Sequence, residues 1–127
     1  MIKDEEKRII EDYIEAYNAF DVEAMLSLLS PDVQFKNISN GVVDTEASGI
    51  DELRRLAIQS ASLFSERKQT ITAWKKSGEW VEVAIDYQAR LKADLPNGLK
   101  AGDRLALKGR STFRLKAGRI AAITDES

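Results

Sequence analysis

The sequence predicts a single α+β domain in which three helices pack on one face of a strongly curved, mostly antiparallel sheet. Two observations support this fold class. Apolar residues recur at helical spacing in the first half of the chain and alternate with polar residues after residue 66. The predicted helices come first, interrupted by one strand, and four strands then follow one another, which is typical of α+β domains. A length of 127 residues fits one domain covering residues 1–127.

Three helices are predicted from apolar stripes and capping residues. The first covers residues 3–19, where the apolar side chains share one face. Asp21 is suited to cap a short second helix, which ends before Pro31 because proline cannot continue a helix. Ser48 followed by Asp51 has the pattern of an N-cap with an acidic residue in the first turn. This pair therefore predicts the start of the third helix.

Five strands are predicted from alternating apolar and polar residues. The first lies at residues 33–38 and is followed by a turn at Asn40-Gly41. Residues 42–49 show no clear pattern. The four later strands are predicted at residues 69–75, 79–92, 103–116 and 119–124.

The composition excludes several classes of function. The net charge of −2 gives no basic footprint for nucleic acid. The chain has no cysteine and no histidine, which excludes disulfides, Ser-His-Asp catalysis and metal sites built on these residues. The longest uncharged stretch, residues 56–65, is too short to span a membrane. The charged residues 1–8 lack an apolar signal core, so we expect a cytoplasmic protein. We also expect no cofactor and no metal.

Several runs of residues resemble one known family. The run Ala16–Met25, which leads into Leu29–Phe35, is similar to the helix-to-strand signature of the SnoaL-like and ketosteroid-isomerase-like branch of the nuclear transport factor two-like superfamily. Ser48–Leu53 resembles the glycine-led entry into that family's third helix. Ser111–Leu115 and Gly118–Ile120 resemble its final hairpin. The resemblance implies a cone-shaped, cystatin-like fold that encloses an apolar pocket.

The resemblance also implies which residues line that pocket and contact a ligand. They are Tyr13, Tyr17, Phe35, Asn37, Val83, Ile85, Tyr87, Leu107, Gly109, Ser111 and Phe113. Tyr13 and Tyr17 lie four residues apart and therefore share a helix face, where they also fit a role as core aromatics. Asn37 also fits a role in bonding backbone near the following turn. Small residues at positions 109 and 111 leave room for a cavity.

Carried over from ketosteroid isomerase, the resemblance places Tyr13 at the tyrosine position, Asn37 at the base position and Ser111 at the second acid position. Asparagine has no useful basicity at neutral pH, so ketosteroid isomerase activity is not expected. Asp44 and Glu46 are the best remaining proton carriers, with solvated loop carboxylates as the alternative. Their number and spacing do not indicate a metal site.

Two functions stay open from the sequence. The first is binding of a small, largely apolar organic molecule by a lyase or isomerase, with Tyr13 donating a hydrogen bond and Asn37 and Ser111 orienting an oxygen. The second is a non-catalytic ligand-binding or association domain. Trp74 and Trp80 are predicted on the outer face of the sheet, where exposed tryptophans favour a partner surface. We therefore expect a homodimer through that face.

Overall fold

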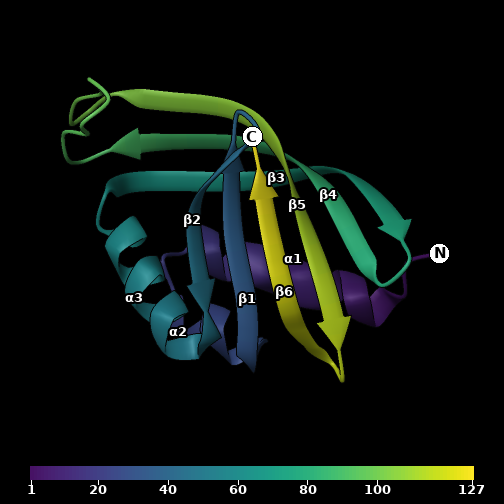
Figure 1. Cartoon of the computed structure of the whole chain (residues 1–127). Helices are drawn as coiled ribbons and strands as arrows, with labels where there is room; N and C mark the ends of the chain where they lie inside the picture. Colours follow the sequence, from purple (N-terminus) through teal and green to yellow (C-terminus); the bar gives the residue numbers. More distant parts are fainter.

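A computed structural model describes all 127 residues and shows three helices against one curved, open sheet (Figure 1). The chain order is α1 (Asp4–Asn18), α2 (Val22–Ser27), β1 (Leu29–Ser39), β2 (Val42–Ser48), α3 (Gly49–Ala61), β3 (Phe64–Ser77), β4 (Trp80–Leu91), β5 (Arg104–Lys116) and β6 (Arg119–Glu126). The predicted α+β class, the three helices and the five predicted strands are confirmed. The segment that showed no pattern forms a sixth strand, β2.

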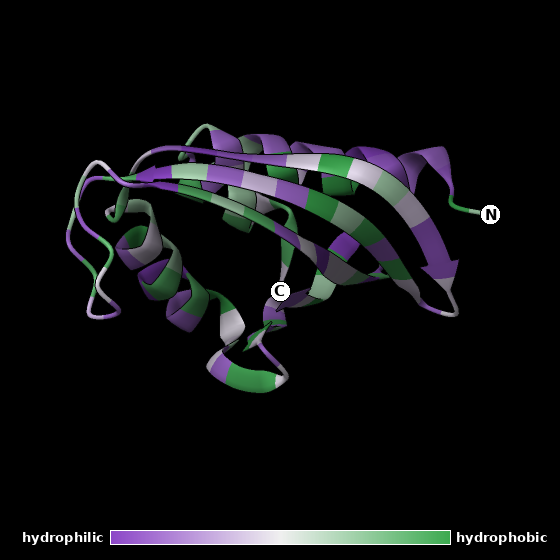
Figure 2. Cartoon of the chain, turned by 90° about the horizontal axis from the view of Figure 1, so that it is seen from above, coloured by the Kyte–Doolittle hydropathy of each residue, from purple (hydrophilic) through white to green (hydrophobic).

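The six strands lie in the order β2-β1-β6-β5-β4-β3. All neighbours are antiparallel except β1 and β6, which run parallel. Because β6 pairs with β1, the last strand of the chain lies inside the sheet, between β1 and β5. The long strands β3, β4 and β5 bend over the helical layer, and α1 lies against their inner face (Figures 1 and 2).

Local chemistry accounts for the ends of the helices. The Asp21 carboxylate accepts a hydrogen bond from the Ala24 amide at 3.1 Å, so Asp21 caps α2 as predicted. Ser48 is the residue before α3, as predicted, but its hydroxyl donates to Gln34 in β1 instead of capping the helix. Glu52, not Asp51, accepts the Ser48 amide at 2.9 Å. The start of α3 is thereby fixed to the edge of the sheet.

The core lies between the concave face of the sheet and the helices. Fully buried side chains from α1, β4, β5 and β6 meet there, including Ile10, Val83, Phe113 and Ile123. Hydrophilic residues cover the outward side of α1 (Figure 2). No helix is both long and apolar enough to cross a membrane.

One prediction about the outer face is wrong. Trp74 packs against the core and lies under Lys7 of α1, whose ammonium is 5.4 Å from the ring centroid. A register shift between Ile71 and Ala73 puts Ile71 and Trp74 on the same inner face, which strict alternation would not do. Trp80 alternates with the buried Val81 and therefore lies on the outer face. A homodimer through that face stays a prediction and now rests on Trp80 alone.

Candidate functional site

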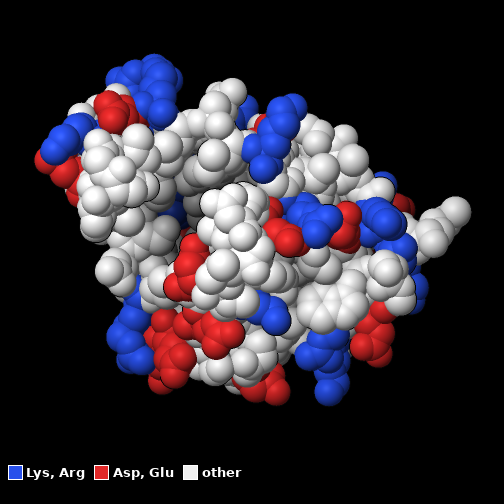
Figure 3. Space-filling model, turned by 45° about the horizontal axis from the view of Figure 1, so that its top comes forward, with Lys and Arg blue, Asp and Glu red and all other residues white.

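A cavity of about 580 Å³ lies between the concave sheet, α1 and α3. Sixteen of its 29 lining residues are hydrophobic, and its volume is that of a typical small-molecule site. The space-filling view shows a hollow in this face of the molecule, with acidic and basic side chains beside it (Figure 3). The polar side chains that line the cavity come from α1, α3 and all six strands, so only the tertiary fold brings them together.

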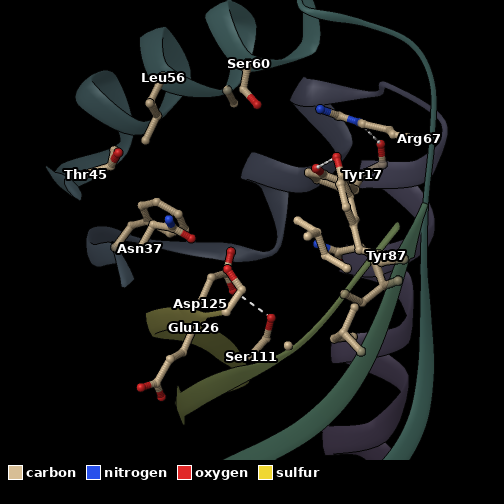
Figure 4. Close-up of a pocket in the computed structure, with 18 of the residues that line it drawn as sticks. Tyr17, Asn37, Thr45, Leu56, Ser60, Arg67, Tyr87, Ser111, Asp125 and Glu126 are labelled. Carbon is tan, nitrogen blue, oxygen red and sulfur yellow. Dashed lines mark hydrogen bonds between the residues drawn. The ribbon is translucent and has the colours of Figure 1, made fainter. Parts of the chain in front are cut away.

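Asp125 presents its carboxyl group to this cavity (Figure 4). It follows Ile123 on the inner face of β6, and it lies between Asn37 on β1 and Ser111 on β5 in the register of the sheet. The buried Ser111 hydroxyl donates to Asp125 Oδ1 at 2.7 Å. Three neighbouring strands therefore form one polar row at the floor of the cavity: an amide, a carboxyl group and a hydroxyl.

The position of Asp125 changes its acidity. Burial raises the pKa of Asp125 to about 6, because the charged carboxylate is poorly solvated inside the cavity. The hydrogen bond from Ser111 opposes this shift by stabilising the carboxylate. The group is therefore mostly ionised at pH 7 and becomes protonated just below it. That is the range in which a carboxylate serves best as a general base.

Tyr13 supplies a free hydrogen-bond donor to the same cavity. Its ring is buried and meets Phe113 edge to face, with centroids 5.9 Å apart. Its hydroxyl makes no hydrogen bond within the protein. Burial raises the pKa of Tyr13 well above its usual range, and the charge of Asp125 raises it further. The phenol therefore keeps its proton at any ordinary pH and stays a donor.

A second polar cluster, made of Tyr17, Tyr87 and Arg67, lines the cavity near the end of α1. The hydroxyl oxygens of Tyr17 and Tyr87 share a hydrogen bond of 2.9 Å. The Arg67 guanidinium stacks over the Tyr17 ring at 3.7 Å, and its Nε donates to the Tyr17 carbonyl at 2.8 Å. Burial raises the pKa of both tyrosines. Arg67 is 5% exposed and is the one charged residue among the fully buried ones.

Asp44 lies at the exposed rim of the cavity and is held there by Asn37. The Asn37 amide donates to Asp44 Oδ1 at 3.0 Å and to the Ser39 hydroxyl at 3.2 Å. The hydrogen bond from Asn37, followed by one from Ser39, lowers the pKa of Asp44. Asp44 is thus a solvated, ionised carboxylate, which is the alternative that the sequence left open for it. Glu46 is exposed and does not line the cavity.

Most of the predicted lining residues border the cavity. Those that do are Tyr13, Tyr17, Phe35, Asn37, Asp44, Ile85, Tyr87, Leu107, Gly109, Ser111 and Phe113. Val83 does not border the cavity and lies fully buried in the core. Asp125 and Arg67 were not predicted. Continuing the alternation of the last strand by two residues past Ile123 would have placed Asp125 on the inner face, whereas Arg67 stands between charged neighbours and carries no such signal.

Gly109 makes room for the chain rather than for a ligand. A Cβ atom added there would lie 2.6 Å from the carbonyl oxygen of Glu126, next to Asp125. Gly109→Ala is therefore expected to push the end of β6 away and to destabilise the fold by about 1–3 kcal/mol, as other overpacking substitutions do. Urea unfolding measures the loss, and the amide resonance of Asp125 reports the displacement. An unchanged stability with an unmoved Asp125 signal would contradict this close approach.

Comparison with known proteins agrees with the fold. No curated protein matches the chain. TsrD from Streptomyces laurentii is similar in structure with a TM-score of 0.79 and 18% identity, over 99% of this chain and 90% of that one. A proposed polyketide cyclase from Xanthomonas campestris has a TM-score of 0.78 and 20% identity, over 95% and 88%. An NTF2-like protein from Burkholderia pseudomallei has a TM-score of 0.77 and 19% identity, over 97% and 90%.

A comparison with protein-family models also matches most of the chain. The family model described as a SnoaL-like domain matches residues 10–123, from α1 to the middle of β6. The fold described above is that of an NTF2-like protein, as in the Burkholderia structure. The chain therefore belongs to the SnoaL-like domain family.

Proposed function

We propose that the chain binds a small, largely apolar organic molecule in this cavity and catalyses a proton transfer on it, as an isomerase or lyase. The observation that carries the proposal is the Asp125 carboxyl group, enclosed at the cavity floor with its pKa raised to about 6. Asp44 and Glu46, the carriers expected from the sequence, lie at the rim and outside the cavity. The description of a similar structure as a proposed polyketide cyclase is compatible with carbon-acid chemistry.

In the proposed proton transfer, Asp125 is the base and Tyr13 is the hydrogen-bond donor. Asp125 takes a proton from a carbon next to a carbonyl group, and the electron pair of that C–H bond forms an enolate. The free Tyr13 hydroxyl donates a hydrogen bond to the enolate oxygen, where negative charge develops. The proton then returns to another carbon, which gives an isomer. In a lyase, the enolate instead expels a leaving group and re-forms the carbonyl.

A generic carbon acid tests whether Asp125 acts as a base. In 5-nitrobenzisoxazole, removal of one C–H proton breaks the N–O bond and releases a coloured phenolate. We expect the protein to accelerate this elimination, and Asp125→Asn to lower the rate at least about 100-fold, the smallest effect usual for a lost general base. The wild-type rate should rise with pH around a midpoint near 6, because only the ionised carboxylate accepts the proton.

Two further variants locate the active carboxylate. Asp86→Asn makes the same chemical change on the outer face of β4, outside the cavity, and should leave the rate unchanged. Asp44→Asn separates the rim carboxylate from the one on the floor. Equal rates for the wild type and Asp125→Asn would contradict catalysis by Asp125 and favour the non-catalytic binding domain. A loss in Asp44→Asn alone would assign the base to the rim.

A further inference from the structure

Arg67 is a buried cation without an acidic partner. Each of the six ion pairs in the structure joins other residues, and none includes Arg67. A buried charge that stays unpaired is costly, and an arginine side chain cannot avoid the cost by losing its proton. The guanidinium borders the cavity, and Figure 4 shows it at the edge of the open space, near Tyr17. The cavity therefore contains one positive group that the protein itself does not neutralise.

The structural role of Arg67 uses only part of its hydrogen-bonding capacity. Its Nε donates to the Tyr17 carbonyl near the end of α1, where a positive charge also suits the helix dipole. Its guanidinium carbon lies over the rings of Tyr17 and Phe20, 3.7 and 4.5 Å from their centroids. These contacts hold the guanidinium in one orientation. The four N–H groups on its terminal nitrogens make no hydrogen bond within the protein.

We propose that Arg67 binds the carboxylate of the ligand, so that the substrate is an apolar organic acid and not a neutral molecule. This inference rests on the proposed function, because it uses the same cavity. A guanidinium held by stacking presents two parallel N–H groups that match the two oxygens of a carboxylate. The apolar part of the ligand would fill the cavity, with the reacting carbon at Asp125.

The other charges in the cavity favour a ligand with one negative charge. Figure 4 shows Arg67 and Asp125 on different sides of the open space, with Tyr17 beside Arg67. The two charged groups therefore meet different parts of a ligand. Arg110 also borders the cavity, but Glu126 already pairs with it at 2.8 Å. One free cation balances one carboxylate, whereas a doubly charged phosphate would keep an excess charge in the same cavity as ionised Asp125.

Binding of 2-naphthoate and of methyl 2-naphthoate tests this assignment, because the two probes share their ring and differ in the charge. We expect the wild type to bind the acid at least about 10-fold more tightly than the ester, measured by fluorescence titration at pH 7.5. Arg67→Met should weaken acid binding by about 10- to 100-fold, the range for a lost hydrogen bond to a charged group, and change ester binding less than about threefold. Arg67→Lys should recover part of the preference.

The outcomes separate this inference from the proposed function. If both probes bind with equal affinity to the wild type, Arg67 serves only the helix end and the inference fails, while the cavity and Asp125 stand. If neither probe binds, the proposed binding cavity fails and the inference fails with it. The comparison of acid and ester on the wild type decides the question even if Arg67→Met does not fold, which thermal unfolding would show. Phosphate that competes with 2-naphthoate more strongly than acetate does would overturn the choice of a carboxylate.

Discussion

Asp125→Asn is expected to make the protein more stable above pH 6, by up to about 3 kcal/mol. The pKa of Asp125 is about 6 in the folded protein against an ordinary value of 3.8, and this difference corresponds to roughly this energy. Between these two values the folded state holds more protons than the unfolded state. Its free energy of unfolding therefore falls as the pH rises from about 4 to 6, and the loss is complete above that range. An asparagine carries no such charge and still accepts the Ser111 hydrogen bond.

Urea unfolding of the wild type and the variant from pH 4 to pH 8 measures this difference. Other acidic groups titrate in both proteins, so the difference between the two curves isolates Asp125. Asp86→Asn is the control, because Asp86 is half-exposed and its contact with Lys108, at 3.7 Å, is a surface ion pair. It should change stability by less than about 1 kcal/mol, as expected for a surface ion pair. A constant difference between wild type and Asp125→Asn would contradict the raised pKa.

The expected pattern has a functional meaning. A group that lowers stability when it is ionised is retained where its charge is needed, and active sites are the common case. A variant that gains stability at pH 8 and loses the elimination of 5-nitrobenzisoxazole would connect both effects to one carboxyl group. Stability gained without loss of activity would leave Asp125 as a strained structural residue only.

Phe113→Ala is expected to be the most destabilising single change, at about 3–5 kcal/mol. Phe113 is 1% exposed and is among the largest fully buried side chains of the core. Its removal leaves a void beneath Tyr13, whose ring contacts it edge to face. Such a loss is a large fraction of the stability of a domain of this size. Urea unfolding at pH 7 measures it.

Leu107→Ala is the matched control on the same strand. Leu107 lies on the same face of β5 as Phe113, six residues earlier, but it is 48% exposed at the edge of the cavity. Its truncation removes little buried surface and should cost less than about 1 kcal/mol. Similar losses for the two variants would contradict the placement of the core under α1 and of the open cavity next to Leu107.

The sequence was sufficient to predict the helices because their signals are local. The cap at Asp21, the entry to α3 at Ser48 and the turn at Asn40-Gly41 each depend on residues within one turn of each other. Phe20, by contrast, has a positive φ of 59°, which no local pattern indicated. The face of β3 on which Trp74 lies was predicted wrongly, because a bulge shifts the alternation of the strand by one residue. A bulge leaves little trace in the composition of the strand.

Some residues of the candidate site were likewise named from the sequence, and others were missed. The resemblance named Tyr13, Asn37 and Ser111 as site residues. All three border the cavity, and Asn37 and Ser111 lie on either side of Asp125. Asp125 itself was missed because two acidic residues at the end of a strand have the composition of a solvated terminus. Its place at the floor of the cavity results from the parallel pairing of β6 with β1, which joins segments nearly ninety positions apart.

The amino-acid sequence by itself determined the fold class and the order of the elements except β2, because periodicity and capping act over a few residues. The aromatic and small residues that border the cavity were named by the resemblance to a known family. Only the tertiary structure decided which charged groups are enclosed. Whether Asp125 or Asp44 is desolvated, and whether Arg67 has an acidic partner, depends on which strands and helices cover each side chain. That covering is set by contacts between distant parts of the chain, and it decides where a proton can be held and where an anion can bind.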